Sequence, residues 1–201
     1  MGKTQPVELT EEPWRPTRAQ LESARAGTVR DVIDHGLQVL FVGINPGLYS
    51  AAIGHHFGRP GNRFWPAMHA GGFTPRVLPP FEEIRLLDYR LGITNIVGRA
   101  TATADELTRA ELQQAAKRLE RKVRRYRPRF VALLGLTSYR AAFGRPRAVL
   151  GRQPERLAGA TLWLLPNPSG LNAHHQPADL ARLFKELQAA VEEECSHHAP
   201  P

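Results

Sequence analysis

Four short apolar runs divide the chain, and each ends in a turn or a polar segment. They are LQVLFV at 37–42, ITNIV at 93–97, FVALLG at 130–135 and TLWLL at 161–165. The runs are apolar nearly throughout, whereas a strand with one exposed face would alternate between apolar and polar residues. This pattern predicts a parallel sheet that is covered by helices on both faces.

Helical patterns separate the apolar runs. Thr17 and Gln20 form a capping-box pair that predicts a short helix ending near residue 27, and Thr108 with Glu111 opens a longer helix. Further helical segments are expected at 62–68, 81–91, 137–143 and 177–194, with an irregular stretch between 144 and 160. The alternation predicts an α/β fold, with three α/β/α layers and a central, mainly parallel sheet of four or five strands.

The length and composition suit a single packed domain. The chain has 201 residues, of which 42% are hydrophobic, enough for one core but short for two. Residues 1–15 contain three acids and two prolines and show no periodicity. We therefore expect a flexible lead-in over 1–15, one domain over 16–194 and a tail over 195–201.

A strong positive charge points to a polyanionic partner. The formal net charge is +8, and 23 of the 27 basic residues are Arg, whose guanidinium matches phosphate. Nucleic acid, an acidic membrane surface and simple solubility all remain compatible with this excess. The densest basic run, 117–129, falls on the outer face and end of a predicted helix, where cations are usually solvated.

Cysteine, histidine and hydropathy patterns exclude several classes of protein. Cys195 is the only cysteine, so the chain can form no internal disulfide, thiolate zinc site or four-cysteine iron–sulfur cluster. The paired histidines at 55–56, 174–175 and 197–198 lack a regular ligand spacing. No stretch approaches 18 apolar residues, and the N-terminus lacks a signal pattern. We expect a soluble, cytoplasmic protein without a metal or cofactor.

Two similar turns follow two of the predicted strands. GINPG places Asn45 after the first strand, and NPSGLN places Leu171 after the last. Ligands bind outside the carboxyl ends of strands in such sheets, so the two turns should share one cleft. The Asn45 amide can orient a water molecule but cannot deprotonate it, and Leu171 suits a wedge that opens a duplex. An ordinary turn and an inward-facing leucine remain the alternatives.

These motifs, in this order, closely resemble those of the mismatch-specific uracil-DNA glycosylases, the Mug and thymine-DNA-glycosylase branch of the uracil-DNA glycosylase superfamily. The likeness runs from about Leu37 to Leu187 and rests on GINPG, NRFW, LLDYRLGITNIV and LPNPSGL. It implies a uracil-DNA glycosylase-like fold, a flipped base held between the two loops, and hydrolysis of the N-glycosidic bond.

The resemblance also assigns roles around the base. It implies that Asn45 positions the attacking water, that Phe57 stacks on the flipped base, and that Ser50 lies near uracil C5. The remaining pocket residues that it implies are Gly43, Ile44 and Asn95. Without the resemblance, Phe57 would be taken for a core residue.

The second loop is expected to contact DNA. The resemblance implies that Leu171 is the wedge and that Gly170 contacts the widowed guanine through its backbone, with Asn167 and Ser169 beside them. Where Mug-type proteins carry Arg after the wedge, this chain has Ala173, followed by His174 and His175. Arg59 and Arg63, beside the proposed pocket, are the expected phosphate contacts.

The chemistry leaves room for an acid. Breaking a glycosidic bond builds positive charge on the sugar, yet the Asn45 loop has no carboxylate. Asp88 is the candidate second catalytic residue, and an ion pair with Arg85 or Arg90 is its structural alternative.

The sequence therefore favours a monofunctional glycosylase that removes uracil from G:U mispairs and leaves an abasic site. Its expected partner is double-stranded DNA, and we expect a monomer. Whether thymine or damaged pyrimidines are also substrates stays open. A non-catalytic mismatch-binding protein with the same pocket is the alternative function, and a nucleotide-binding protein is a weaker one, because GINPG lacks the phosphate-loop signatures.

Overall fold

A computed structural model describes residues 15–170 and 175–196. Its five strands form one sheet in the order β2-β1-β3-β5-β4. The strands β1 (Val39–Gly43), β2 (Leu91–Asn95), β3 (Phe130–Leu134) and β5 (Ala160–Leu165) run parallel, and β4 (Gly151–Leu157) pairs antiparallel with β5. The predicted α/β fold with a mainly parallel central sheet is confirmed.

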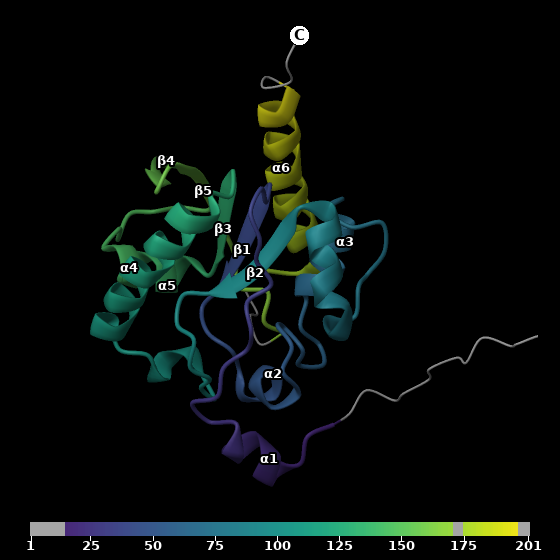
Figure 1. Cartoon of the computed structure of the whole chain (residues 1–201), viewed down its shortest axis with the longest axis vertical. Helices are drawn as coiled ribbons and strands as arrows, with labels where there is room; N and C mark the ends of the chain where they lie inside the picture. The colour runs from purple at the N-terminus through teal and green to yellow at the C-terminus, as the bar shows by residue number, and fades with distance from the viewer. Residues whose placement is uncertain (1–14, 171–174, 197–201) are drawn as a thin grey trace, which may run out of the picture.

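Helices cover both faces of the sheet, which explains why its central strands are apolar throughout (Figure 1). α3 (Phe64–Ala70) and α6 (Pro177–Ser196) pack on one face, and α4 (Arg109–Tyr126) and α5 (Leu136–Phe143) on the other. Phe41 of β1 faces α3 and α6, with its ring centroid 5.6 Å from that of Phe64. Its neighbours Leu40 and Val42 face α4 and α5.

The predicted helix starts are found. At α1 (Arg18–Ser23) both bonds of the capping box form: Thr17 Oγ1 accepts from the Gln20 amide and Gln20 Oε1 accepts from the Thr17 amide. Thr108 Oγ1 likewise accepts from the Glu111 amide at the start of α4. The Glu111 carboxylate instead pairs with Arg99, at 2.6 Å from its Nε.

Two predicted elements differ in type or position. The segment expected as a helix at 81–91 is a 3-10 helix, η1 (Pro80–Tyr89). β2 starts and ends two residues earlier than the apolar run suggested. Ile96 and Val97 lie past the strand but are buried, so their apolar character reflects burial in the core and not membership of the strand.

Three elements were not predicted. The stretch expected to be irregular contains β4, an edge strand whose exposed positions carry charge and which tolerates Pro154 because it lies at the edge. The segment after Asn45, expected as a loop, contains the six-residue helix α2 (Leu48–Ile53). The short 3-10 helix η2 (Ala104–Glu106) follows β2.

The parallel strands bring their carboxyl ends to one edge of the sheet. Figure 1 shows α2 and α1 below the sheet, and α2 begins five residues after β1 ends. The register pairs Gly43, the last residue of β1, with Asn95, the last of β2. Within the described ranges, no helix is both long and apolar enough to cross a membrane.

Candidate functional site

A cavity of about 340 Å³ opens at this edge of the sheet. All four parallel strands contribute to its wall: Gly43, Asn95 and Leu134 end their strands, and Asn167 follows β5. The wall also holds most of the other residues expected from the sequence, namely Ile44, Asn45, Ser50, Phe57, Arg59 and Ser169. The two Asn-Pro turns therefore do share one site.

The Asn45 amide is held in one orientation. Its Nδ2 donates to Thr101 Oγ1 at 2.7 Å and to the carbonyl oxygens of Arg99 at 3.1 Å and Pro46 at 3.2 Å. Because carbonyl oxygens only accept, the nitrogen must face them. Oδ1 is then the branch of the amide left to accept a hydrogen bond from a water molecule in the cavity.

Thr101 supports this arrangement and was not predicted. It is 1% exposed, and its hydroxyl donates to the carbonyl of Thr103 at 2.7 Å while accepting from Asn45. Its isolated bridge to Gly47 holds the two loops together. A threonine in a polar loop carries no sequence signal for this role, which depends on a contact 56 positions away.

Phe57 and Ser50 lie on the same wall. The Phe57 ring stacks on Phe64 at 4.1 Å between centroids and 23° between planes, so one side of the ring packs on the core while the residue lines the cavity. Its φ of 51° is in the left-handed region. Ser50 is buried and its Oγ accepts from the Gly58 amide at 3.1 Å.

Asn95 approaches Gly43 closely at the end of the paired strands. A methyl group added at Gly43 would lie 2.4 Å from Asn95 Oδ1 and 3.3 Å from the Phe57 ring. A side chain at position 43 would therefore displace the Asn95 amide from its place at the cavity wall. On its other branch, Asn95 Nδ2 lies 3.3 Å from Nδ1 of His56, a second cavity residue that was not predicted for this role.

The Arg63 guanidinium holds the second loop, and the phosphate contact expected of Arg63 stays a prediction. Arg63 donates to the carbonyl of Ser169 at 2.9 Å and to that of His175 at 2.5 Å, while its backbone amide donates to Pro168. Gly170 packs against Gly61, whose carbonyl would lie 2.6 Å from a methyl group added there. Arg63 thus contacts residues that precede and follow positions 171–174 in the sequence.

The predictions for Leu171, Ala173 and His174 fall outside the described residues and stay predictions. Arg59 is exposed and lines the cavity, and its contact with phosphate stays a prediction.

The acid that lines the cavity is not the one that the sequence suggested. Asp88, at the end of η1, is exposed and does not line the cavity, whereas Asp105 of η2 does. The arginines considered as partners of Asp88 make other contacts: Arg85 pairs with Glu82, and Arg90 Nε donates to the carbonyl of Gly36. Across residues 15–170 and 175–196, no three His, Cys, Asp or Glu side chains gather to hold a metal ion.

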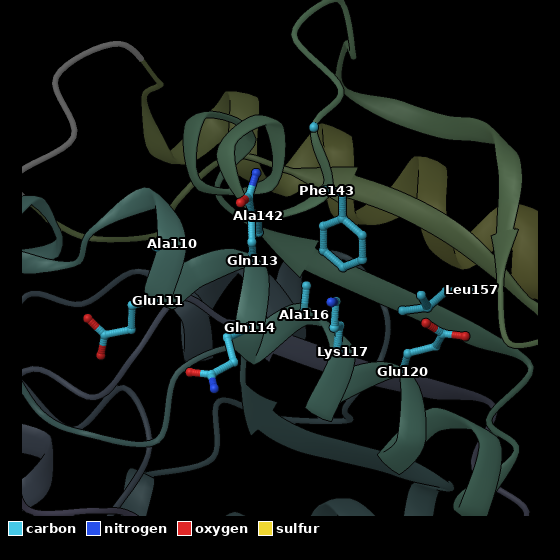
Figure 2. A pocket seen from close by; sticks show the side chains of 11 residues that line it. Ala110, Glu111, Gln113, Gln114, Ala116, Lys117, Glu120, Ala142, Phe143 and Leu157 are labelled. Atoms are coloured by element: carbon cyan, nitrogen blue, oxygen red, sulfur yellow. The ribbon is translucent and has the colours of Figure 1, made fainter.

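A larger hollow, of about 850 Å³, lies between α4 and α5 and shares no lining residue with the first cavity (Figure 2). Its polar lining consists mainly of the glutamines Gln113 and Gln114 and the charged residues Glu111, Lys117 and Glu120. It holds none of the residues expected to carry chemistry. The smaller cavity, with its fixed amides and aromatic wall, is the candidate active site.

Two comparisons with known proteins bear on the fold and the family of the chain. A solution structure of a protein from Methanosarcina acetivorans, described as a candidate uracil DNA glycosylase, superposes with a TM-score of 0.55 and 18% sequence identity. The match covers 81% of this chain and 98% of that one, and shows a shared fold. The sequence profile of the uracil DNA glycosylase superfamily matches residues 31–188, a range that includes the whole cavity wall. The chain belongs to the uracil DNA glycosylase superfamily.

Proposed function

We propose that this glycosylase is monofunctional and mismatch-preferring: it flips uracil paired with guanine out of duplex DNA and hydrolyses the N-glycosidic bond to leave an abasic site. The observation that carries the proposal is the fixed Asn45 amide, whose Oδ1 is left to hold a water molecule in the cavity. The reaction needs no cofactor, because water is the nucleophile and the uracil anion is the leaving group.

The cavity wall fits a flipped pyrimidine. The Phe57 ring, supported from behind by Phe64, offers a flat surface on which a base can stack. The Asn95 amide can accept from N3–H of uracil and donate to O4, while the backbone of Gly43 and Ile44 borders the same space. These contacts would also stabilise the negative charge that develops on the departing base.

The absence of an acid from the Asn45 turn supports slow turnover and a preference for mispairs. Asn45 can orient water but cannot take its proton, so the rate depends on the leaving group and on how easily the base flips. Uracil opposite guanine leaves its pair more easily than uracil opposite adenine, which is the physical basis of the mismatch preference.

Asp105 is better placed than Asp88 to balance the charge that builds on the sugar, because Asp105 lines the cavity. The matched pair Asp105→Asn and Asp88→Asn decides between them. The Asp105 variant is expected to lower the single-turnover rate about tenfold, which is about 1.4 kcal/mol of the barrier. A loss confined to the Asp88 variant would assign the role to Asp88.

The partner is double-stranded DNA, bound by a single copy of the chain. Arg59 at the rim would meet a phosphate, and Leu171 would fill the gap left by the flipped base. Asn167, Ser169 and Gly170 would contact the opposite strand from the loop that Arg63 holds.

One substrate panel tests the proposal. Duplexes with G:U, A:U or G:T pairs and single-stranded uracil are incubated with wild type and Asn45→Ala, and abasic sites are counted after alkaline cleavage. We expect cleavage fastest at G:U and a loss of about a hundredfold in the variant. Tight G:U binding without abasic sites would instead support the mismatch-binding alternative, and equal cleavage of all uracil substrates would refute the preference.

A further inference from the structure

We propose that His56 is a positioning residue that holds the Asn95 amide in the orientation that selects uracil over cytosine. The inference deepens the proposed function and rests on it. His56 is a buried part of the cavity wall, and its ring lies between the carbonyl of Arg30 and the side chain of Asn95.

The hydrogen bonds of the His56 ring determine its tautomer. Nε2 lies 3.0 Å from the carbonyl oxygen of Arg30, which only accepts, so Nε2 carries a proton. In a neutral ring, Nδ1 then has a lone pair and accepts. Its neighbour at 3.3 Å is Asn95 Nδ2, which donates. The carbonyl of Arg30 thereby determines which branch of the Asn95 amide faces the histidine.

The surroundings keep the His56 ring neutral and hold it in place. His56 is 2% exposed, and burial lowers its pKa to about 4, with Lys122 and His55 acting in the same direction and Asp31 and the Arg30 carbonyl opposing. The His56 backbone amide donates to Glu83 Oε2 at 2.8 Å, and His55 Nδ1 lies 3.0 Å from Glu83 Oε1. The ring is thus held both through its backbone and through its Nε2.

The orientation of the Asn95 amide determines which base can hydrogen-bond to it. With Nδ2 directed at His56, Oδ1 lies beside Gly43 at the cavity wall. An amide in this orientation matches uracil, which has a donor at N3 and an acceptor at C4. Cytosine has an acceptor at N3 and an amino group at C4, so both contacts fail. Without the histidine, the amide could turn over and match cytosine.

A matched pair of variants tests whether His56 holds the Asn95 amide in this orientation. In His56→Asn, Oδ1 takes the place of Nδ1 and keeps an acceptor toward Asn95. In His56→Gln, the side-chain amide of the glutamine reaches the position of Nε2, so no acceptor remains at the position of Nδ1 to face Asn95. Activity is measured on 5-fluorouracil and 5-fluorocytosine, which differ only at N3 and C4, each placed opposite an abasic-site analogue so that pairing does not bias flipping.

We expect His56→Gln to lower the ratio of kcat/KM for 5-fluorouracil to kcat/KM for 5-fluorocytosine by about tenfold or more. His56→Asn is expected to keep the greater part of this preference. Thermal unfolding of both variants identifies a general loss of folding, which would lower both activities and leave their ratio unchanged. An unchanged ratio in His56→Gln overturns the proposal.

Nitrogen-15 NMR of the His56 ring tests the proposed tautomer without measuring a reaction. The expected result is a neutral His56 protonated at Nε2 in the wild-type protein at pH 7, and a proton on Nδ1 overturns the inference. If the expected tautomer is found but no uracil is released from any substrate, the proposed function fails while the positioning of Asn95 stands.

Discussion

The buried histidine predicts an acid-sensitive contribution to stability that can be isolated by a single substitution. Burial lowers the pKa of His56 from 6.5 to about 4 in the folded protein. The unfolded chain therefore binds this proton below pH 6.5, and the folded protein does so only below about pH 4. Between these values the unfolded state holds more protons, so the free energy of unfolding falls as the pH falls. The full gap corresponds to about 3 kcal/mol.

A neighbouring carboxyl acts in the opposite direction. Burial raises the pKa of Glu83, so the folded state takes up this proton more readily and gains stability as the pH falls. The wild-type curve therefore shows the balance of both groups. His56→Gln removes only the titrating ring and leaves Glu83, so the difference between the two curves belongs to the histidine.

Urea unfolding of wild type and His56→Gln at pH values from 7.5 to 4.5 measures this difference. We expect the wild-type advantage to be greatest near pH 7 and to shrink by most of about 3 kcal/mol toward pH 4.5. Parallel curves over the whole range would refute the reasoning, because they would mean that the histidine binds its proton equally in both states.

Three further substitutions test the site. Asn45→Asp is expected to lower activity and cost about 1–3 kcal/mol in urea unfolding, since a carboxylate oxygen would face the carbonyls that accept from the amide; an active and equally stable variant would contradict this. Gly43→Ala places a methyl group 2.4 Å from Asn95 Oδ1 and should abolish uracil release with little change in Tm. Arg63→Gln frees the carbonyls of Ser169 and His175 and should slow cleavage in duplexes about tenfold more than in single strands; an equal loss on both would show that the loop does not act in opening the duplex.

The polar side chains of the site show where sequence reasoning succeeded and where it did not. Asn45, Phe57 and Asn95 all line the cavity. Asn45 was predicted from its place after a buried strand, because the carboxyl ends of parallel strands meet at one edge. Phe57 and Asn95 were predicted only from the resemblance to the glycosylase motifs. The sequence did not predict that the Arg63 guanidinium holds the carbonyls of two residues more than 100 positions away, because no local pattern indicates such a contact.

The missed strand has a similar explanation. β4 carries exposed charged residues and Pro154, and it pairs along one side only, so its sequence lacks the apolar run that marks the other four strands. The 3-10 form of η1 was missed because the spacing of its apolar residues also suits an α-helix.

The sequence by itself determined the layered α/β fold, because burial on both faces of a sheet requires continuous apolar strands, and that requirement is local. It also determined that the two Asn-Pro turns share a site. Only the tertiary structure decided how the amides of Asn45 and Asn95 are turned, since each orientation depends on partners brought from other loops: Thr101 and Arg99 for one, His56 for the other. A side-chain amide has two nearly identical orientations, and only its three-dimensional neighbours make them unequal.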